Sequence, residues 1–303
     1  MTQWTISTAD KIVIEEPVTD LHVRIVGGAV NVVAAEGPAR LEVTELEGEP
    51  LQVTLAEGVL TVSYANLDWN DFGDKLKSVE SVKHFLSGLR RKRRAVVSLT
   101  VPASTTVKVG TVTAEATVSG IHGGTSVYGV EGDTTLVELD GRTEAKTVSG
   151  NIDAQAVAGE LRVNTVNGEL TVVSGTAATL RAKSISGGVT LDLNGTTPAD
   201  VKITTVNGDV VVRLPQPADT TVEAGSTNGR FSSAFDELTL GGTWGSKKLS
   251  GKLGEGTGRL QVTTVSGAIS LLSRPEPQDE GPRLVKELPA TPADAVTPEG
   301  DQA

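Results

Sequence analysis

Residues 132–172 read GDTTLVELD-GRTEAKTVS-GNIDAQAVA-GELRVNTVN-GELTV, and every ninth residue is glycine: Gly132, Gly141, Gly150, Gly159 and Gly168. Aligned on these glycines, the segments repeat the same columns of apolar or small side chains. Two residues after the glycine stand Thr134, Thr143, Ile152, Leu161 and Leu170; four after it stand Leu136, Ala145, Ala154, Val163 and Val172; seven after it stand Leu139, Val148, Val157 and Val166. These columns predict the inward face of short strands. Stacked units of fixed period, two halves to a coil of about 18 residues, are typical of a β-solenoid.

A four-residue motif of the form T-V-[SN]-G supports the stacking. It recurs, with Ser, Ile or Thr at some positions, at Thr117–Gly120, Thr147–Gly150, Thr165–Gly168, Ser184–Gly187, Thr205–Gly208, Ser226–Gly229 and Thr264–Gly267. Successive glycines are 30, 18, 19, 21, 21 and 38 residues apart, so the two long intervals predict extra material within a coil. The Ser or Asn before each glycine either forms a side-chain ladder or turns the chain. We expect Gly150 and Gly168 to adopt a backbone conformation that only glycine tolerates well.

The segments on either side of the repeats have different patterns. Residues 1–65 alternate apolar and polar side chains, which predicts an antiparallel meander at the start of the fold. Residues 274–303 contain six prolines and seven acidic residues, which predicts a disordered tail. We therefore expect one elongated all-β domain over residues 1–273: a β-solenoid, or single-stranded β-helix-like stack, with one helical insert.

That insert spans residues 66–94. Its apolar residues recur at steps of three or four, as in an amphipathic helix: Trp69, Phe72, Leu76, Val79, Val82, Leu86 and Leu89. It ends in a basic cluster, Arg90, Arg91, Lys92, Arg93 and Arg94. One interpretation is a helix that caps the open end of the stack. Another is contact of residues 68–94 with an anionic membrane surface through a basic end that projects into solvent. Nucleic acid is a weaker third target, because the chain as a whole is acidic.

Composition excludes several kinds of chemistry. The chain has no cysteine, so disulfides, thiolate catalysis and Cys-based zinc sites are excluded. Its three histidines, His22, His84 and His122, are far apart in sequence. The net charge of −11 argues against general nucleic-acid binding. The first residues, MTQWTISTADKIVIEE, resemble no secretory signal, and no apolar run reaches the roughly 18 residues of a spanning helix. We therefore expect a cytoplasmic protein, with peripheral attachment at the inner membrane face as one possibility.

Two kinds of functional site match these patterns in part. A nine-residue Gly/Asp repeat suggests calcium, but each repeat has one glycine, and Asp133, Asp140 and Asp153 occur irregularly. A carbohydrate-active β-helix enzyme needs paired carboxylates in a groove, for which Asp192 and Asp209 are the candidates. Neither interpretation is supported by a complete set of residues. We expect no catalytic residues, no metal and no cofactor.

The chain also resembles a known family. The repeated T-V-[SN]-G motif, the strand end at Val101-Pro102 and the closing GRLQVTTVSGAISLL at residues 258–272 are similar to the bacterial putative-adhesin β-strand-repeat family, also called the Toastrack domain. The resemblance covers roughly residues 10–273. It implies a β-helix-like stack, no known catalytic residues and a link to cell-envelope stress systems. Family members often accompany or carry membrane segments, and we expect none in this chain.

These observations lead to one functional hypothesis and two rivals. The leading hypothesis is a non-catalytic scaffold or interaction module that binds a protein partner, tied to envelope stress at the cytoplasmic face. One rival is a self-assembling cytoskeletal-type β-helix, in which homo-oligomers form through complementary ends. The other is the carbohydrate-active enzyme.

Overall fold

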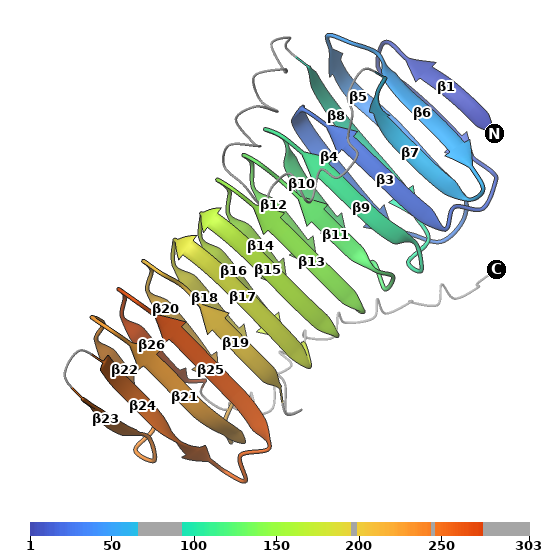
Figure 1. The fold of residues 1–303 in the computed structure, drawn as a ribbon. Coiled ribbons are helices and arrows are strands. Elements are labelled where there is room, and N and C mark those ends of the chain that lie inside the picture. Colours follow the sequence, from blue (N-terminus) through green and yellow to red (C-terminus); the bar gives the residue numbers. More distant parts are fainter. Residues whose placement is uncertain (66–92, 195–198, 244–245, 275–303) are drawn as a thin grey trace, which may run out of the picture.

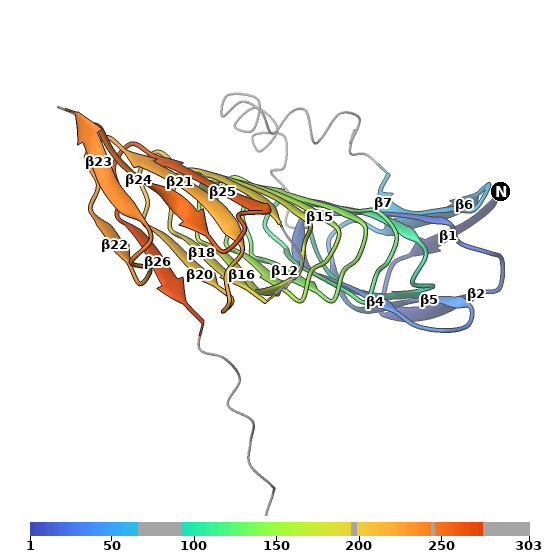
Figure 2. The same cartoon turned by 90° about the horizontal axis from the view of Figure 1, so that it is seen from below.

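The structure is a computed structural model that describes residues 1–65, 93–194, 199–243 and 246–274. Two long β-sheets face each other along an elongated stack, with the blue N-terminal strands at one end and the orange C-terminal strands at the other (Figure 1). Seen from below, the two sheets form the walls of a flattened tube (Figure 2). We call the 14-stranded sheet sheet A and the 12-stranded sheet sheet B. The described ranges contain strands and turns and no helix.

The spatial order of the strands differs from their order in sequence in both sheets. Sheet A consists of β1 (Thr2–Ile6), β6 (Leu51–Ala56), β7 (Val59–Tyr64), β3 (Asp20–Ile25), β9 (Thr106–Thr111), β11 (Thr125–Tyr128), β13 (Arg142–Thr147), β15 (Glu160–Asn167), β17 (Thr179–Ser186), β19 (Asp200–Thr204), β25 (Gly258–Thr264), β21 (Thr220–Ser226), β24 (Ser246–Leu253) and β23 (Thr239–Thr243). Sheet B consists of β2 (Asp10–Ile14), β5 (Ala39–Glu47), β8 (Arg94–Val101), β4 (Gly27–Ala34), β10 (Glu115–Ser119), β12 (Thr134–Val137), β14 (Ile152–Gln155), β16 (Leu170–Gly175), β18 (Val189–Leu193), β20 (Val210–Leu214), β26 (Ile269–Ser273) and β22 (Phe231–Ser233).

Each coil of the stack has one strand in each sheet and pairs in parallel with the coils above and below. In sheet A, Leu161 lies opposite Thr143 on one side and Leu180 on the other, which are 18 and 19 residues away in sequence. The interior between the sheets holds narrow aliphatic side chains, and Leu161 and Val163 are fully buried. The predicted columns two and four residues after each glycine are confirmed, because all ten of their members are buried.

The prediction that the residue seven positions after each glycine points inward is wrong in every second repeat. Leu139 and Val157 are buried, but Val148 and Val166 are only partly buried. The residues before them, Thr147 and Thr165, are buried instead. The physical reason is that β15 continues its alternation past Val163, so that the next inward position falls on the threonine of the T-V-[SN]-G motif.

Most motif glycines are required by close approach of two backbones rather than by a positive φ, which occurs in this series at Gly120 and Gly187. A Cβ on Gly168 would lie 2.1 Å from the carbonyl oxygen of Gly150, and one on Gly187 would lie 2.0 Å from that of Gly168. Real Cβ atoms essentially never come so near another atom. Neither Gly150 nor Gly168 has a positive φ, so our expectation about their backbone conformation is wrong. Positive φ occurs instead at Gly132, Gly141 and Gly159.

The two long glycine intervals in the motif series have different structural causes. The 38-residue interval contains the antiparallel hairpin of β23 and β24, so the extra material predicted there is confirmed, whereas the 30-residue interval reflects a copy that lies on the other sheet. The copy at residues 117–120 lies on β10 of sheet B, and a Cβ on Gly120 would face Ala34 rather than another motif glycine. At the other end, Gly267 stacks on Gly208, and Gly229 stacks on Gly267. The coil β25–β26 therefore lies between coils β19–β20 and β21–β22, although it follows both in sequence.

The N-terminal strands form an antiparallel meander only in part. Antiparallel pairing joins β1 to β6, β6 to β7, β2 to β5 and β5 to β8. By contrast, β3 pairs in parallel with β7 and β9, and β4 pairs in parallel with β8 and β10. The first coil of the solenoid thus lies within the segment predicted as a meander. The reason is that β7 and β8, which come later, enter between strands that precede them.

The helix predicted at 66–94 lies outside the described residues, except at its last two positions. Arg94 is already the first residue of β8. The predicted tail also lies outside them, except for Arg274. Where the chain is described, no helix is long and apolar enough to cross a membrane.

Candidate functional site

The outer face of sheet A carries most of the positive charge of the described strands. Between β9 and β24, the strands of this sheet contain eleven cationic residues and four carboxylates. The cations are Lys108, Arg142, Lys146, Arg162, Arg181, Lys183, Lys202, Lys247, Lys248, Lys252 and Arg259; the carboxylates are Glu144, Glu160, Asp200 and Glu223. Over the same coils, the strands of sheet B contain Glu115, Asp153 and Asp192 against Arg213 alone. Ten of these cations lie on the outer side of the sheet, since Lys247 stands opposite buried Ser226. A chain of net charge −11 thus has one basic face.

The parallel register places these cations in a row. Arg162 lies opposite Arg181, and Arg181 lies opposite Lys202, in three adjacent strands. Neighbouring strands are about 4.8 Å apart, so like charges are held well within a screening length of about 8 Å. Such a row is costly in the isolated protein and becomes favourable when anionic groups lie across it.

Some of these cations are neutralised by neighbours on the same face. Arg181 donates a short hydrogen bond to Asp200, and this contact lowers the pKa of Asp200 below its usual range. Lys146 contacts Glu144 at 2.7 Å. Burial raises the pKa of Glu144, but the hydrogen bond and the charge of Lys146 outweigh it, so the net direction is downward. These pairs fix part of the face in a defined geometry.

Other cations of these strands have no acidic partner within the described residues. Among the described residues, Lys108, Lys183, Lys202 and Lys247 are exposed and make no ion pair. The field of the row reaches His22 in β3, which lies opposite Lys108. Burial lowers the pKa of His22, and the charges of Lys108 and Arg24 lower it further.

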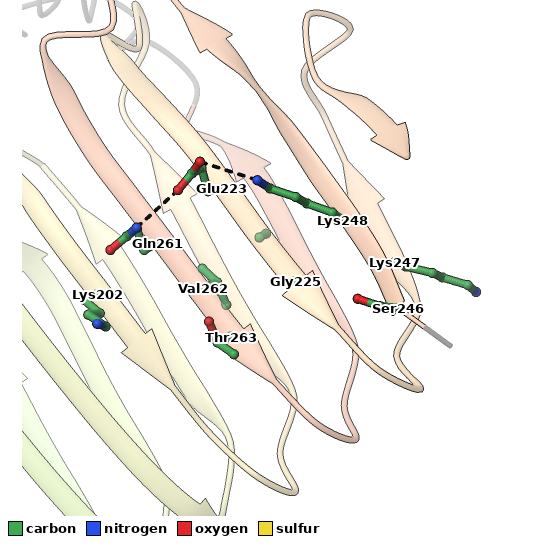
Figure 3. Close-up of a pocket in the computed structure, with 10 residues that line it drawn as sticks. Lys202, Glu223, Gly225, Ser246, Lys247, Lys248, Gln261, Val262 and Thr263 are labelled. Carbon is green, nitrogen blue, oxygen red and sulfur yellow. Dashed lines mark hydrogen bonds and ion pairs between the residues drawn. The ribbon is translucent and has the colours of Figure 1, made fainter. Parts of the chain in front are cut away.

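An open pocket of about 260 Å³ lies on this face where β19, β25, β21 and β24 meet (Figure 3). Gly225 leaves a gap in the row of outward side chains, since a Cβ on it would meet nothing within 4 Å. Lys202 and Lys248 stand on the two sides of this gap, while the side chain of Lys247 extends away from it (Figure 3). The one carboxylate of the lining, Glu223, is already bound by Gln261 at 3.2 Å and Lys248 at 3.5 Å. Chemically, the pocket suits a small anionic group.

Comparison with family models shows where the chain belongs. The model described as Toastrack DUF4097 matches residues 97–272, more than half of the chain. The chain belongs to this Toastrack family. The match confirms the resemblance found in the sequence, and it covers the coils that carry the basic face.

Two solved structures are similar to this Toastrack chain. One is a putative cell adhesion protein from Clostridium sporogenes, with 11% identity, coverage of 88% of this chain and 100% of the other, and a TM-score of 0.26. The other is a putative lipid binding protein from Parabacteroides distasonis, with 12% identity, coverage of 89% and 98%, and a TM-score of 0.43. No curated protein matches the chain.

The basic cluster predicted at residues 90–94 is only partly within the described Toastrack fold. Arg90, Arg91 and Lys92 lie outside the described residues. Arg93 has a side chain only 8% exposed, and its Nη2 lies 2.9 Å from Oε2 of Glu49. Its guanidinium also lies 5.7 Å from the centre of the Tyr64 ring. Arg94 in β8 pairs with Glu45 at 3.5 Å. Arg93 is thus held within the fold, whereas the side chain of Arg94 is exposed and pairs with Glu45 at the surface.

The two carboxylates considered for catalysis are not brought together. Asp192 points from β18 of sheet B toward Arg213 and Arg274, at 3.3 and 3.6 Å. Asp209 lies at the corner before β20, where its Oδ1 accepts a hydrogen bond from the N–H of Ala268 at 2.7 Å. Each carboxylate thus has its own structural partners.

The aspartates considered for calcium have similar local uses. Asp133 accepts a hydrogen bond from the N–H of Asn151, and Asp140 from the N–H of Gly141. Asp153 is exposed on the outer face of β14. In the described ranges, no three His, Cys, Asp or Glu side chains are grouped as metal ligands.

The basic face does not emerge when charge is assessed over the whole chain. A usable signal is nevertheless present in the repeat itself. If alternate nine-residue halves belong to opposite sheets, the outward residues of 141–149 and 159–167 include Arg142, Lys146 and Arg162. The intervening half, 150–158, contributes Asp153 instead.

Proposed function

We propose that this Toastrack chain is a non-catalytic interaction module that binds an anionic partner through the outer face of sheet A. The observation that carries the proposal is the segregation of eleven cations onto the strands of one sheet in a chain of net charge −11. Random placement of charges on an acidic protein would give each face an excess of carboxylates. The rigid parallel register holds the cations in place, which reduces the entropy lost on binding.

The cellular setting is part of the same proposal. The family resemblance implies a link to envelope stress, and we propose that the module acts at the cytoplasmic face of the envelope. The predicted insert at residues 66–94 remains a second candidate contact with an anionic membrane surface. Its apolar pattern is also compatible with a cap on the stack.

Both rival functions have weaker support. A carbohydrate-active enzyme needs converging carboxylates, and Asp192 and Asp209 have separate partners. A self-assembling fibre needs matching ends, and the free edges at the C-terminal end are unequal: β22 has three residues, whereas β23 has five and contains Gly241 and Gly242.

The proposal is tested by binding to dextran sulfate, a flexible polyanion without apolar groups. Wild type should bind, and the affinity should fall as salt rises, because screening weakens contacts between exposed charges. Lys183→Glu with Lys202→Glu should weaken binding strongly. Lys11→Glu with Arg40→Glu is the matched control, since it makes the same change of charge at exposed sites of sheet B. Equal loss in both variants, or binding independent of salt, would refute a role for this face.

A further inference from the structure

The T-V-[SN]-G corner has an inverted polarity. In the copy on sheet B, Val118 is buried and Thr117 is only partly buried. In the copies on sheet A, the hydroxyl residue points into the core instead, and Thr165, Ser184, Thr205 and Thr264 are all buried. The aliphatic residue that follows points outward. Ile185 is 48% exposed, Val206 40% and Val265 45%. A core-forming repeat would place these two residue types the other way round.

The aliphatic residues of these copies form a column along one corner of the stack, exposed at Ile185, Val206 and Val265 and partly buried at Val148 and Val166. We call Val148, Val166, Ile185, Val206 and Val265 the corner ridge. They follow β13, β15, β17, β19 and β25 or lie near their ends, and these strands are consecutive in sheet A (Figure 1). Backbone bonds tie the column together: the N–H of Asn167 donates to Val148, that of Asn207 to Ile185 and that of Ser266 to Val206. At about 4.8 Å per strand, the five positions of the ridge extend over roughly 20 Å.

The corner ridge borders the basic face directly. In β17, Lys183 and Ile185 are two residues apart, so they lie on the same outer side of the sheet, and both are exposed. In β13, Lys146 precedes Val148 by the same step. The pocket at Gly225 is lined by Thr263, which stands two residues before Val265. A line of aliphatic side chains thus runs beside a field of cations.

We propose that the corner ridge and the basic face dock together on the surface of an anionic phospholipid bilayer. This inference rests on the proposed function, since it names the anionic partner of the same face. The cations would contact headgroup phosphates, and the corner ridge would enter the interface between headgroups and acyl chains.

The charge pattern and the ridge together favour lipid over nucleic acid. A nucleic acid offers phosphates but rewards aromatic side chains that stack on bases. In the described strands of the basic face, the aromatic residue is Tyr128, whose ring lies under Lys146 and whose hydroxyl donates to Glu144. The exposed aliphatic side chains of the corner ridge contribute no binding free energy when the partner is a purely polar polyanion. The corner ridge contributes binding free energy at a membrane interface, which is apolar just below the charged headgroups.

The aliphatic residues of the ridge could also be there for structural reasons alone, and an experiment can distinguish this explanation from membrane contact. Exposed β-branched residues favour strands and pack against like residues in adjacent strands. Threonine keeps the β-branch and the strand preference but lacks the apolar surface. Ile185→Thr with Val206→Thr and Val265→Thr therefore retains the shape of the column. The matched control is Val13→Thr with Val33→Thr and Val173→Thr, three comparably exposed sites of sheet B.

The experiment is flotation of the full chain with vesicles of phosphatidylcholine alone or mixed in equal parts with phosphatidylglycerol. Wild type and the sheet B control should float with the anionic vesicles and not with the neutral ones. The ridge variant should partition about tenfold more weakly, because apolar surface is lost from three side chains, while its melting temperature and its binding to dextran sulfate stay unchanged.

Three results would overturn the inference. Flotation of the ridge variant equal to wild type would show that the ridge makes no contact. If wild type fails to float but binds dextran sulfate in a salt-dependent way, the partner of the basic face is a polyanion other than lipid. Higher affinity for single-stranded DNA than for the anionic vesicles would assign the face to nucleic acid. Failure to bind dextran sulfate as well would refute the proposed function itself.

Discussion

Gly150 lies directly against Gly132 of the neighbouring coil, so that a Cβ on Gly150 would be 2.1 Å from the Gly132 carbonyl oxygen. The same relationship continues through Gly168, Gly187, Gly208, Gly267 and Gly229. One corner of the solenoid is therefore a column of backbones with no room for side chains. This column lets the corner keep the strand spacing of about 4.8 Å that backbone hydrogen bonding sets, and the cations and the corner ridge share that spacing.

The first prediction concerns this column. Gly150→Ala should lower the free energy of unfolding by about 1–3 kcal/mol, because the new methyl group must push two coils apart. Gly225→Ala is the control: it also adds a methyl group in a sheet A strand, but there the space is open. It should change stability by less than about 0.5 kcal/mol. Chemical denaturation of both variants measures the difference, and equal effects would contradict the close-approach explanation.

The second prediction concerns the core columns. Val163 is fully buried between the sheets, so Val163→Asp places a carboxylate in a narrow apolar interior. It should cost several kcal/mol in stability. Val173→Asp makes the same chemical change on the outer face of β16, where Val173 is 40% exposed, and should be tolerated. An unchanged melting temperature in Val163→Asp would mean that the column is assigned to the wrong face.

The strand columns can be predicted from sequence because burial and period-two alternation are local. Leu161 and Val163 are placed correctly for that reason. Val166 is misplaced when an aliphatic residue is assumed to point inward. Alternation from Val163 alone indicates Thr165 as the next buried position. At this corner the period predicts the buried face correctly, and the chemistry of the side chain does not.

The order of the coils could not be predicted in the same way. Insertion of β25 between β19 and β21 depends on pairing between segments far apart in sequence. Each of these strands has a similar aliphatic pattern, so the sequence does not rank one neighbour above another. The basic face needs that order as well, because Lys202 and Lys248 flank the same pocket only when β25 and β21 lie between their strands.

The third prediction is a pH dependence. Burial raises the pKa of Tyr64 to about 12 and also raises the pKa of Tyr128. An unfolded tyrosine loses its proton near pH 10, whereas folded Tyr64 keeps it up to about pH 12. In this window the folded state binds more protons, so stability falls as pH rises, by about 3 kcal/mol in total for Tyr64.

The absorbance of tyrosinate measures the pKa of each tyrosine directly, because the chain contains only two tyrosines and one can be replaced at a time. In Tyr128→Phe, the remaining signal should appear well above pH 10 in the native protein and near pH 10 in denaturant. In Tyr64→Phe, the loss of stability between about pH 10 and 12 should be smaller than in wild type. Titration of native Tyr64 near pH 10 would contradict its buried position beside Arg93.

The last prediction tests the coil order. Thr221 lies opposite Arg259, and Arg259 lies opposite Asp200, so Thr221 and Asp200 are separated by a whole strand. The chain has no cysteine, so an engineered pair provides its only thiols. Thr221→Cys with Arg259→Cys should form a disulfide on mild oxidation, because adjacent strands bring Cα atoms within the usual limit of about 7 Å. Thr221→Cys with Asp200→Cys should not, since two strand spacings amount to about 9.6 Å. Mobility on a non-reducing gel distinguishes the pairs. A stack in simple sequence order would give the opposite result, and it would also separate Lys248 from the pocket that it lines.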